Sequence, residues 1–263
     1  MTRETAPEQP EQPEQLEQAE QAEQQAEPTL RQKIVMAAAE LLEDGGLEAV
    51  STRAVAARAG VPTPSIFRIF GDKDGLLEEV AEHGFRRYLA VKAELLGGGD
   101  PVQVLRDAWD LHIRFGLEHP AYYALVYGQV RPGHLPRAGR RAVADLRHMI
   151  TQVAAAGRLR MSVDRAAEVM HSAGVGTILT LVGRPKAERD PRTSDVARDM
   201  VISTLTLPPA GDGDEPSGST VASSAMALLV ALGQDDTASL SPAERTLLLE
   251  WLNRLADATD GPG

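Results

Sequence analysis

From residue 29 onward, apolar residues recur at helical spacing along nearly the whole chain. Leu30, Ile34, Ala38 and Leu41 follow one another at intervals of three and four residues, which is the stripe of an amphipathic helix. Clusters of Gly and Pro interrupt the pattern where helices would end. Between them the pattern predicts later helices at about 75–96, 101–118, 138–156, 163–182, 194–205, 220–232 and 242–258. No stretch alternates apolar and polar residues as a strand would, so we expect an all-α fold.

The first 28 residues have a different composition from the rest. They hold eight Glu and one Arg among many Gln and Pro, a net charge of −7. So little of this segment is apolar that it predicts a disordered tail. The whole chain carries −11, which argues against a DNA-binding protein, because Lys and Arg supply most of the affinity for phosphates. The tail accounts for more than half of that charge, and the sequence leaves open whether it competes with DNA or only adds charge to the surface.

Residue types and segments that the sequence lacks also restrict the function. There is no Cys among the 263 residues, which excludes disulfides, thiol catalysis and Cys-ligated metals. The longest weakly polar stretches, around 175–182 and 225–232, are shorter than the roughly 20 residues that a membrane span needs. We therefore expect a cytoplasmic protein with no membrane partner. A flexible loop is predicted at 211–219, where the sequence is GDGDEPSGS.

The segment STRAVAARAGVPTPSIFRIFGDKDGLL, residues 51–77, predicts two short helices joined by a glycine turn. Ser51 is placed to cap the first helix and Gly60 to adopt the left-handed turn conformation. Thr63 is placed to cap the second helix, with Pro64 at its first position. Two short helices after a longer one form a helix-turn-helix, whose second helix presents its N-terminal side chains to base edges in the major groove.

This segment resembles the N-terminal helix-turn-helix of TetR-family transcriptional regulators. Matches to that family's pattern occur, in order and spacing, at Ala59, Gly60, Val61, Phe67, Phe70, Lys73, Asp74, Gly75 and Leu76. The resemblance covers about residues 29–77; the remainder agrees only in helix number and length. Ala54 stands where the family usually has an acidic residue, Pro62 where Ser is common, and Ile69 where His or Tyr is common.

The resemblance implies a three-helix DNA-binding domain at 29–77 and a helical effector-binding and dimerisation domain at 78–263. Thr63, Pro64 and Arg68 would face the major groove, and Phe67 would touch a thymine methyl or a sugar, unless it is a core residue. Ser51, Arg53, Ser65 and Lys73 would contact DNA phosphates or stabilise the turn between the helices. Arg31 and Lys33 would add contacts to the DNA backbone. Residues 29–76 hold six basic and six acidic side chains, so a positive face requires the two signs to lie apart.

An aromatic segment at 109–128 marks a candidate effector pocket. Pocket lining is predicted for Trp109, His112, Ile113, Phe115, Tyr123, Tyr127, Met149, Met170 and His171. The alternative is that these residues are ordinary core. A stripe of mostly small residues suits either a helix at a dimer interface or a helix buried within one chain; it consists of Ala166, Met170, Ala173, Thr177 and Leu181.

These observations favour a ligand-responsive transcriptional regulator. The resemblance implies a homodimer that binds a palindromic double-stranded DNA operator, most often as a repressor, and is released by a small-molecule effector. No metal-binding, nucleophile or phosphate-loop motif is present, so we expect no cofactor, no metal and no catalysis. Two alternatives stay open: a helical scaffold that has lost DNA binding, and a helical enzyme.

Overall fold

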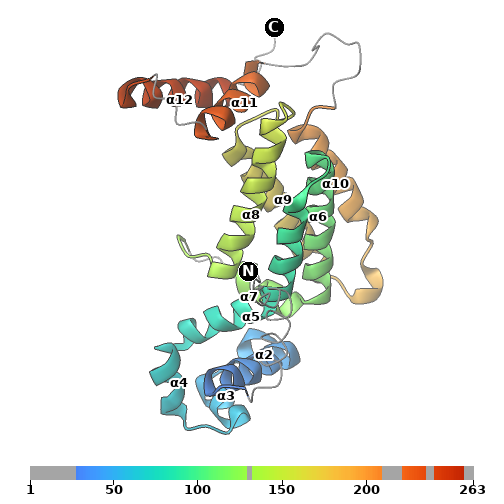
Figure 1. The fold of residues 1–263 in the computed structure, drawn as a ribbon. Helices are drawn as coiled ribbons and strands as arrows, with labels where there is room; N and C mark the ends of the chain where they lie inside the picture. The colour runs from blue at the N-terminus through green and yellow to red at the C-terminus, as the bar shows by residue number, and fades with distance from the viewer. Residues whose placement is uncertain (1–27, 129–131, 209–220, 235–239, 258–263) are drawn as a thin grey trace, which may run out of the picture.

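In the computed structural model, the described residues are 28–128, 132–208, 221–234 and 240–257. Within these ranges the chain forms eleven α-helices, two short 3₁₀ helices and one isolated antiparallel bridge between Leu159 and Thr206 (Figure 1). The predicted all-α fold is therefore confirmed. The predicted disordered tail, apart from Pro28, and the predicted loop at 211–219 lie outside the described residues.

Three helices and the first turns of a fourth form what we call the head. These are α2 (Leu30–Ala49), α3 (Thr52–Ala59), α4 (Thr63–Phe70) and the start of α5 (Lys73–Glu94). Helix α2 begins at a capping box, in which the Thr29 side chain accepts from the Gln32 backbone and the Gln32 side chain accepts from Thr29. Its regular part ends at Gly46, whose φ of 66° breaks the helix. The head core is closed by four fully buried residues, Ile34, Val55, Ile66 and Leu76.

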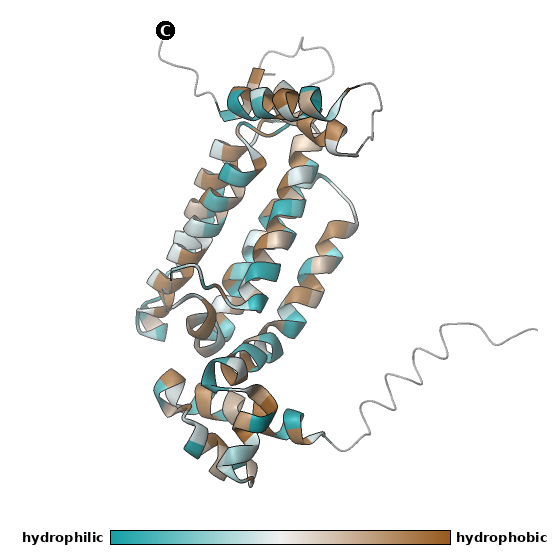
Figure 2. Cartoon of the chain, turned by 90° about the vertical axis from the view of Figure 1, so that its left-hand side faces the viewer, coloured by the Kyte–Doolittle hydropathy of each residue, from teal (hydrophilic) through white to brown (hydrophobic). Residues whose placement is uncertain are grey.

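The larger part, which we call the body, is a bundle of helices. It comprises the rest of α5, α6 (Pro101–Glu118), α7 (Pro120–Tyr127), α8 (Arg137–Ala155), α9 (Val163–Val182) and α10 (Arg192–Leu205). Helix α5 belongs to both parts, and Figure 2 shows it leading from the head into the bundle. Fully buried side chains from several helices, including Phe85, Leu105, Ile150 and Ile178, form the bundle core.

Helix α7 is the element that the sequence pattern did not predict. It has eight residues and begins directly after α6, with Pro120 at its first position. Eight residues make only about two turns, too few for a helical period to stand out. Pro120 ends α6 because it cannot continue a helix, but it also starts α7, since its missing N–H is tolerated in a first turn.

The last two helices form a hairpin at the end of the body away from the head (Figure 1). Helix α11 (Val221–Gln234) packs on α8 and on α12 (Pro242–Asp257). Both helices match the predicted segments to within two residues. The hairpin leaves an apolar stripe of α12 exposed, formed by Leu247, Trp251 and Leu255. No helix of the described ranges is long and apolar enough to cross a bilayer.

Candidate functional site

The turn between α3 and α4 has the geometry that its sequence predicts. The Ser51 hydroxyl accepts a hydrogen bond from the Ala54 backbone at 3.1 Å and caps α3. Gly60 has a φ of 67°, a left-handed conformation that costs Gly little. The Val61 backbone then donates to the Ala56 carbonyl at 2.9 Å, which closes the turn. The capping role of Ser51 and the turn role of Gly60 are confirmed.

The predicted cap of α4 is wrong by one residue. Helix α4 begins at Thr63 itself, and Pro62 occupies the N-cap position without a side-chain hydrogen bond. Pro64 therefore lies at the second helical position. The extended φ and ψ of Pro62 set the entry of the chain into the helix, so a Thr hydroxyl is not needed there. As a result, the Thr63 hydroxyl does not cap the helix and lies in its first turn.

All ten residues predicted to contact DNA lie on the surface of the head. Phe67 has 48% of its surface exposed, so it is not a core residue, whereas Ile69 is only partly exposed and packs against the core. Exposed or half-exposed positions are taken by Arg31, Lys33, Ser51, Arg53, Thr63, Pro64, Ser65, Phe67, Arg68 and Lys73. All ten lie within residues 31–73, and their roles in DNA binding stay predictions.

Two arginines of the head are engaged within the chain. Helix α2 carries four acidic residues, Glu40, Glu43, Asp44 and Glu48. Arg58 pairs with two of them, with Glu40 at 3.0 Å and with Asp44 at 3.5 Å. Arg31 donates to the Ile69 carbonyl at 3.0 Å, lies 3.4 Å from Glu79, and its guanidinium carbon lies 5.0 Å above the Phe70 ring. Arg31 therefore ties α2 to α4 and α5, a structural role that sequence reasoning did not anticipate.

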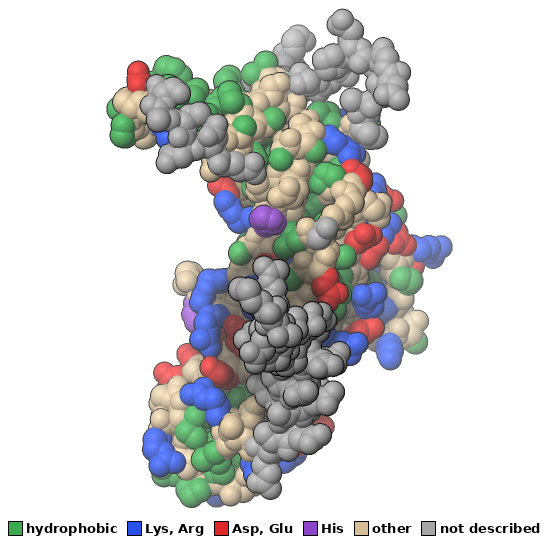
Figure 3. Space-filling model, in the orientation of Figure 1, with side chains coloured by type: hydrophobic (Ala, Val, Ile, Leu, Met, Phe, Trp, Pro, Cys, Tyr) green, Lys and Arg blue, Asp and Glu red, His purple; other side chains and the backbone are tan. Residues whose placement is uncertain are grey.

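Four other cations of the head remain unpaired. Among the described residues, Lys33, Arg53, Arg68 and Lys73 are exposed and have no hydrogen-bonding or ion-pair partner. Figure 3 shows separate Lys and Arg side chains on the visible face of the head. Glu40 and Asp44 of α2 form ion pairs with Arg58, and the Asp72 carboxylate caps the N-terminus of α5. Pairing within the chain thus occupies Arg58, Glu40 and Asp44 and leaves the four other cations exposed.

A small cavity lies inside the body, between α5, α6, α7, α8 and α9. Five of the nine predicted pocket residues line it: Trp109, His112, Tyr127, Met170 and His171. Its wall is completed by residues that were not predicted, namely Tyr88, Lys92, Ala108, Ala142, Leu146 and Gly174. The cavity offers about 30 Å³ to the centres of water molecules, which is room for about two waters.

The other four predicted pocket residues do not line this cavity. Ile113 and Met149 are buried in the bundle core. Phe115 stacks on Tyr88, with ring centroids 4.6 Å apart, and faces a different surface cleft between α5 and α6. Tyr123 is hydrogen-bonded to His112 and does not reach the cavity wall. Ile113, Phe115 and Met149 are therefore core residues, which is the alternative that the sequence left open.

Lys92 is the pocket residue that sequence reasoning missed. Only 5% of it is exposed, and its ammonium donates to the Ala142 carbonyl at 2.7 Å. The nitrogen lies 5.8 Å from the centroid of the Tyr88 ring. Burial lowers the pKa of Lys92 to about 8, and the charge of Asp145 opposes that shift. At neutral pH the cavity wall therefore carries a buried positive charge.

His112 is held in the cavity wall by two tyrosines. The Tyr88 hydroxyl lies 3.0 Å from Nδ1 and the Tyr123 hydroxyl 3.1 Å from Nε2. Burial, with the nearby charge of Lys92, lowers the pKa of His112 to about 3, and burial also lowers the pKa of His171. Both rings are neutral at pH 7. The Tyr127 hydroxyl is buried, and among the described residues it has no hydrogen-bond partner.

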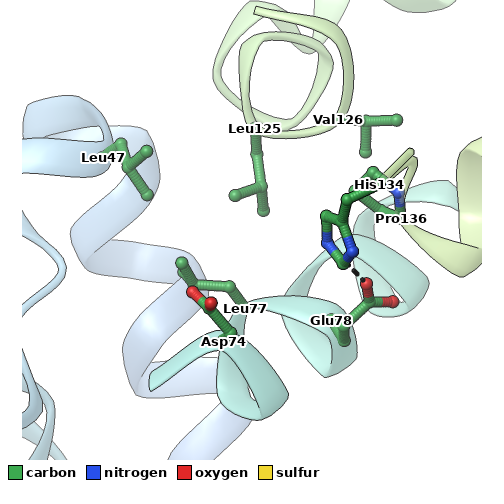
Figure 4. Close-up of a pocket in the computed structure, with 8 residues that line it drawn as sticks. All are labelled: Leu47, Asp74, Leu77, Glu78, Leu125, Val126, His134 and Pro136. Atoms are coloured by element: carbon green, nitrogen blue, oxygen red, sulfur yellow. Dashed lines mark ion pairs between the residues drawn. The ribbon is translucent and has the colours of Figure 1, made fainter. Parts of the chain in front are cut away.

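Head and body meet at a joint formed by α2, α5, α7 and the segment before α8. Figure 4 shows Leu125 of α7 pointing toward Leu77 of α5, with Leu47 of α2 beside them and His134 on the other side. His134 Nε2 lies 3.5 Å from Glu78. The small gap between these residues lies where α7 contacts the head.

Charged groups cross the same joint. The Arg137 backbone at the start of α8 donates to Glu78 at 3.0 Å, and its guanidinium donates to Glu79 at 3.2 Å. Glu79 also pairs with Arg31. A path of side-chain contacts therefore leads from α8 through α5 to α2 and, by the bond of Arg31 to the Ile69 carbonyl, to α4.

The small-residue stripe on α9 lies inside the chain. Ala166, Met170 and Leu181 are buried, while Ala173 and Thr177 are half-buried. The three buried residues pack within one chain, as the intrachain interpretation expects, and the interpretation of this stripe as a dimer interface stays a prediction. Outside the stripe, α9 exposes Val169 and Leu179, and α10, which packs against α9, exposes Val196 and Met200.

One family model matches the chain. Residues 34–80, which include most of the head, match the model described as bacterial regulatory proteins, tetR family. No curated protein matches the chain.

Solved structures with a similar fold cover about two thirds of this chain. A protein of unknown function from Rhodococcus sp. RHA1 is 23% identical with a TM-score of 0.58, covering 70% of this chain and 98% of its own. A Shewanella sp. PV-4 protein assigned to the tetR family of transcription regulators is 19% identical with a TM-score of 0.56, covering 69% and 100%. The transcriptional regulator FadR from Bacillus subtilis, in complex with stearoyl-CoA, is 16% identical with a TM-score of 0.56, covering 65% and 97%. At this identity the likeness establishes the fold.

Proposed function

We propose that this chain, whose residues 34–80 match the tetR-family model, is a ligand-responsive repressor that binds a palindromic DNA operator as a homodimer. A small-molecule effector bound in the body releases it from DNA. The observation that carries the proposal is the set of four unpaired cations, Lys33, Arg53, Arg68 and Lys73, around a helix-turn-helix whose second helix is exposed.

On this proposal, the exposed start of α4 enters the major groove. Thr63, Pro64 and Arg68 face base edges, and the exposed Phe67 ring contacts a thymine methyl or a sugar. Ser51, Arg53, Ser65 and Lys73 lie around this helix and fix its register on the phosphates. Arg31 contributes indirectly by holding α4 through the Ile69 carbonyl. Lys33, one turn from the start of α2, adds a phosphate contact.

A second copy is needed because one head has few cations and a neutral sum of charges. The exposed apolar face of α9 and α10 is the surface that we assign to dimerisation. Val196 and Met200, with 68% and 63% of their surfaces exposed, lie four residues apart on α10, and α9, which packs against α10, exposes Leu179 and Val169. Two such faces pack as a four-helix bundle about a two-fold axis, which places two heads on a two-fold symmetric site.

The effector acts through the cavity and the joint. Helix α7 supplies Tyr127 to the cavity wall and Leu125 to the joint, and these two residues are half a turn apart. Helix α8 likewise supplies Ala142 to the cavity and Arg137 to the joint. An effector that needs a larger cavity displaces α7 or α8, which changes the angle of the heads. Binding to the off-DNA form then lowers operator affinity by mass action.

The proposal is tested by selecting bound sequences from a random DNA pool and measuring affinity for the selected site at several salt concentrations. We expect a palindrome with half-sites about 34 Å apart, or a multiple of that distance, and an affinity that falls steeply with salt. Arg68→Ala should weaken binding to the selected site by about 10-fold to 100-fold. Arg254→Ala, on the remote hairpin, removes the same group as a matched control and should have no effect. No retained DNA at low salt would favour the scaffold alternative instead.

A further inference from the structure

We propose that the cavity around Lys92 binds an organic monoanion, a small carboxylic acid with an apolar or aromatic body, and that the carboxylate pairs with the Lys92 ammonium. The inference rests on the proposed function only where it identifies the acid as the effector. Binding of the acid itself is measured without DNA.

The charge of the cavity wall favours one negative charge. Lys92 is almost fully buried, and its one hydrogen bond is to the neutral carbonyl of Ala142. An ammonium has three protons to donate. Among the described residues no carboxylate forms an ion pair or hydrogen bond with it; Asp145 of α8 acts on it only through its electrostatic field. A buried charge without a counter-ion is costly, and an anion in the cavity would remove that cost.

The other titratable groups that face Lys92 do not supply the missing charge. Tyr88 lies on the same helix, His112 on α6, Tyr127 on α7 and His171 on α9. The two histidines are neutral at pH 7 because burial lowers the pKa of each. Burial raises the pKa of Tyr88 and of Tyr127, so neither ionises near neutral pH. The cavity wall therefore carries a single positive charge.

The free hydrogen-bonding groups also suit an acceptor. The buried Tyr127 hydroxyl has no partner within the described ranges, and it lines the same cavity as the Lys92 ammonium. A hydroxyl can donate to a carboxylate oxygen, and such charge-assisted bonds are stronger than neutral ones. The cavity wall contains no Asp or Glu, so nothing in it would repel an anion.

The rest of the wall determines the body of the acid. Trp109, Leu146 and Met170 supply apolar surface. Gly174 lets α9 approach His112 closely, since a Cβ at that position would lie only 3.3 Å from His112 Cδ2. The free space is only large enough for about two waters. An acid larger than acetate must therefore move side chains, and the unbranched Met170 is the one most easily displaced. The link to the joint runs through Tyr127 of α7 and Ala142 of α8, which line the same cavity.

The test uses the intrinsic fluorescence of Trp109. The chain has two Trp residues, and the exposed Trp251 is replaced in a Trp251→Phe background, so that the emission comes from the cavity. Benzoate, phenylacetate and octanoate are titrated in parallel with benzamide, phenylacetamide and octanamide, which have the same bodies without the charge. Lys92→Met and Lys92→Gln remove the ammonium, and the exposed Lys186→Met is the matched control.

We expect at least one acid to change Trp109 emission saturably, its amide to bind at least about tenfold more weakly, and both Lys92 variants to lose at least about tenfold in affinity for that acid. Lys186→Met should bind like the parent. Equal binding of acid and amide, unchanged affinity in the Lys92 variants, or no response to any acid up to about 10 mM would overturn the proposal. Circular dichroism verifies that each variant is folded. A chain that binds the acid but no DNA contradicts the proposed function alone, and one that binds DNA but no acid contradicts this inference alone.

Discussion

Replacing Lys92 by Met should stabilise the folded protein at neutral pH, although it removes a hydrogen bond. In the folded state the pKa of Lys92 falls from 10.5 to about 8, chiefly through burial. Each unit of that shift corresponds to about 1.4 kcal/mol, so keeping the lysine charged in the folded protein at pH 7 costs roughly 3 kcal/mol. The lost bond to the Ala142 carbonyl contributes about 1 kcal/mol in the other direction. The expected net gain is about 2 kcal/mol in the free energy of unfolding.

The pH dependence of that gain separates the electrostatic cause from better packing. The folded-state pKa lies below the unfolded value, so between about pH 8 and 10.5 the unfolded chain keeps a proton that the folded chain has lost. The contribution of Lys92 to stability therefore rises with pH in that window. The parent recovers about 2 kcal/mol between pH 7 and pH 9.5, and the variant does not. At pH 9.5 the two proteins should be about equally stable.

Denaturant unfolding followed by circular dichroism at pH 7 and 9.5 measures both quantities. All samples have the same protein concentration, because dimerisation would add a concentration-dependent contribution to the stability. Lys186→Met is the control and should change little at either pH, since Lys186 is exposed. A less stable Lys92→Met protein at pH 7, or an equal gain at both pH values, would refute the reasoning that a charged lysine is buried without a counter-ion.

Three further predictions concern DNA, ligand and dimer. Lys73→Ala should weaken DNA binding for all sequences and reduce the salt slope by about one phosphate, as measured by anisotropy; an unchanged slope would exclude a phosphate contact. The dissociation constant of a bound acid should rise about tenfold between pH 7 and pH 9 as Lys92 loses its proton near pH 8, and a flat titration would contradict the ion pair. Met200→Asp should convert a dimer to monomers in analytical ultracentrifugation, because it places a charge on the exposed apolar face of α10. A dimer that persists would place the interface elsewhere.

The sequence predicted the head better than the body because the head is built from local signals. Ser51 caps α3 and Gly60 forms the turn through contacts within five residues along the chain, so their roles are visible in a short segment. Thr63 was misplaced by one residue because either Pro62 or Thr63 can precede a helix with Pro64 in its first turn. Arg31 was assigned only to DNA because its contact with the Ile69 carbonyl joins residues 38 apart.

The cavity could be predicted only in part because it depends on how five helices meet. The many aromatic residues of 109–128 identified Trp109, His112 and Tyr127 as lining residues. They did not show that Ile113 and Phe115 from the same segment would pack in the core instead. Lys92 had a local signal that was not used. It continues the apolar stripe of Phe85, Tyr88 and Leu89 at helical spacing, and a lysine in line with such a stripe is a candidate for burial.

The buried lysine also limits how strongly an acid could control DNA binding. Moving a two-state equilibrium from 1:99 to 99:1 needs about 5.5 kcal/mol of differential binding. Pairing with an anion can relieve at most the roughly 3 kcal/mol that the shifted pKa of Lys92 represents. That energy contributes to the switch only if the acid fits the off-DNA form better, since a ligand with equal affinity for both forms shifts nothing. The body of the acid must therefore supply the remainder by displacing α7 or α8, which connect the cavity to the joint. A minimal anion such as acetate should thus bind at Lys92 and leave operator affinity nearly unchanged, whereas a larger acid should lower it.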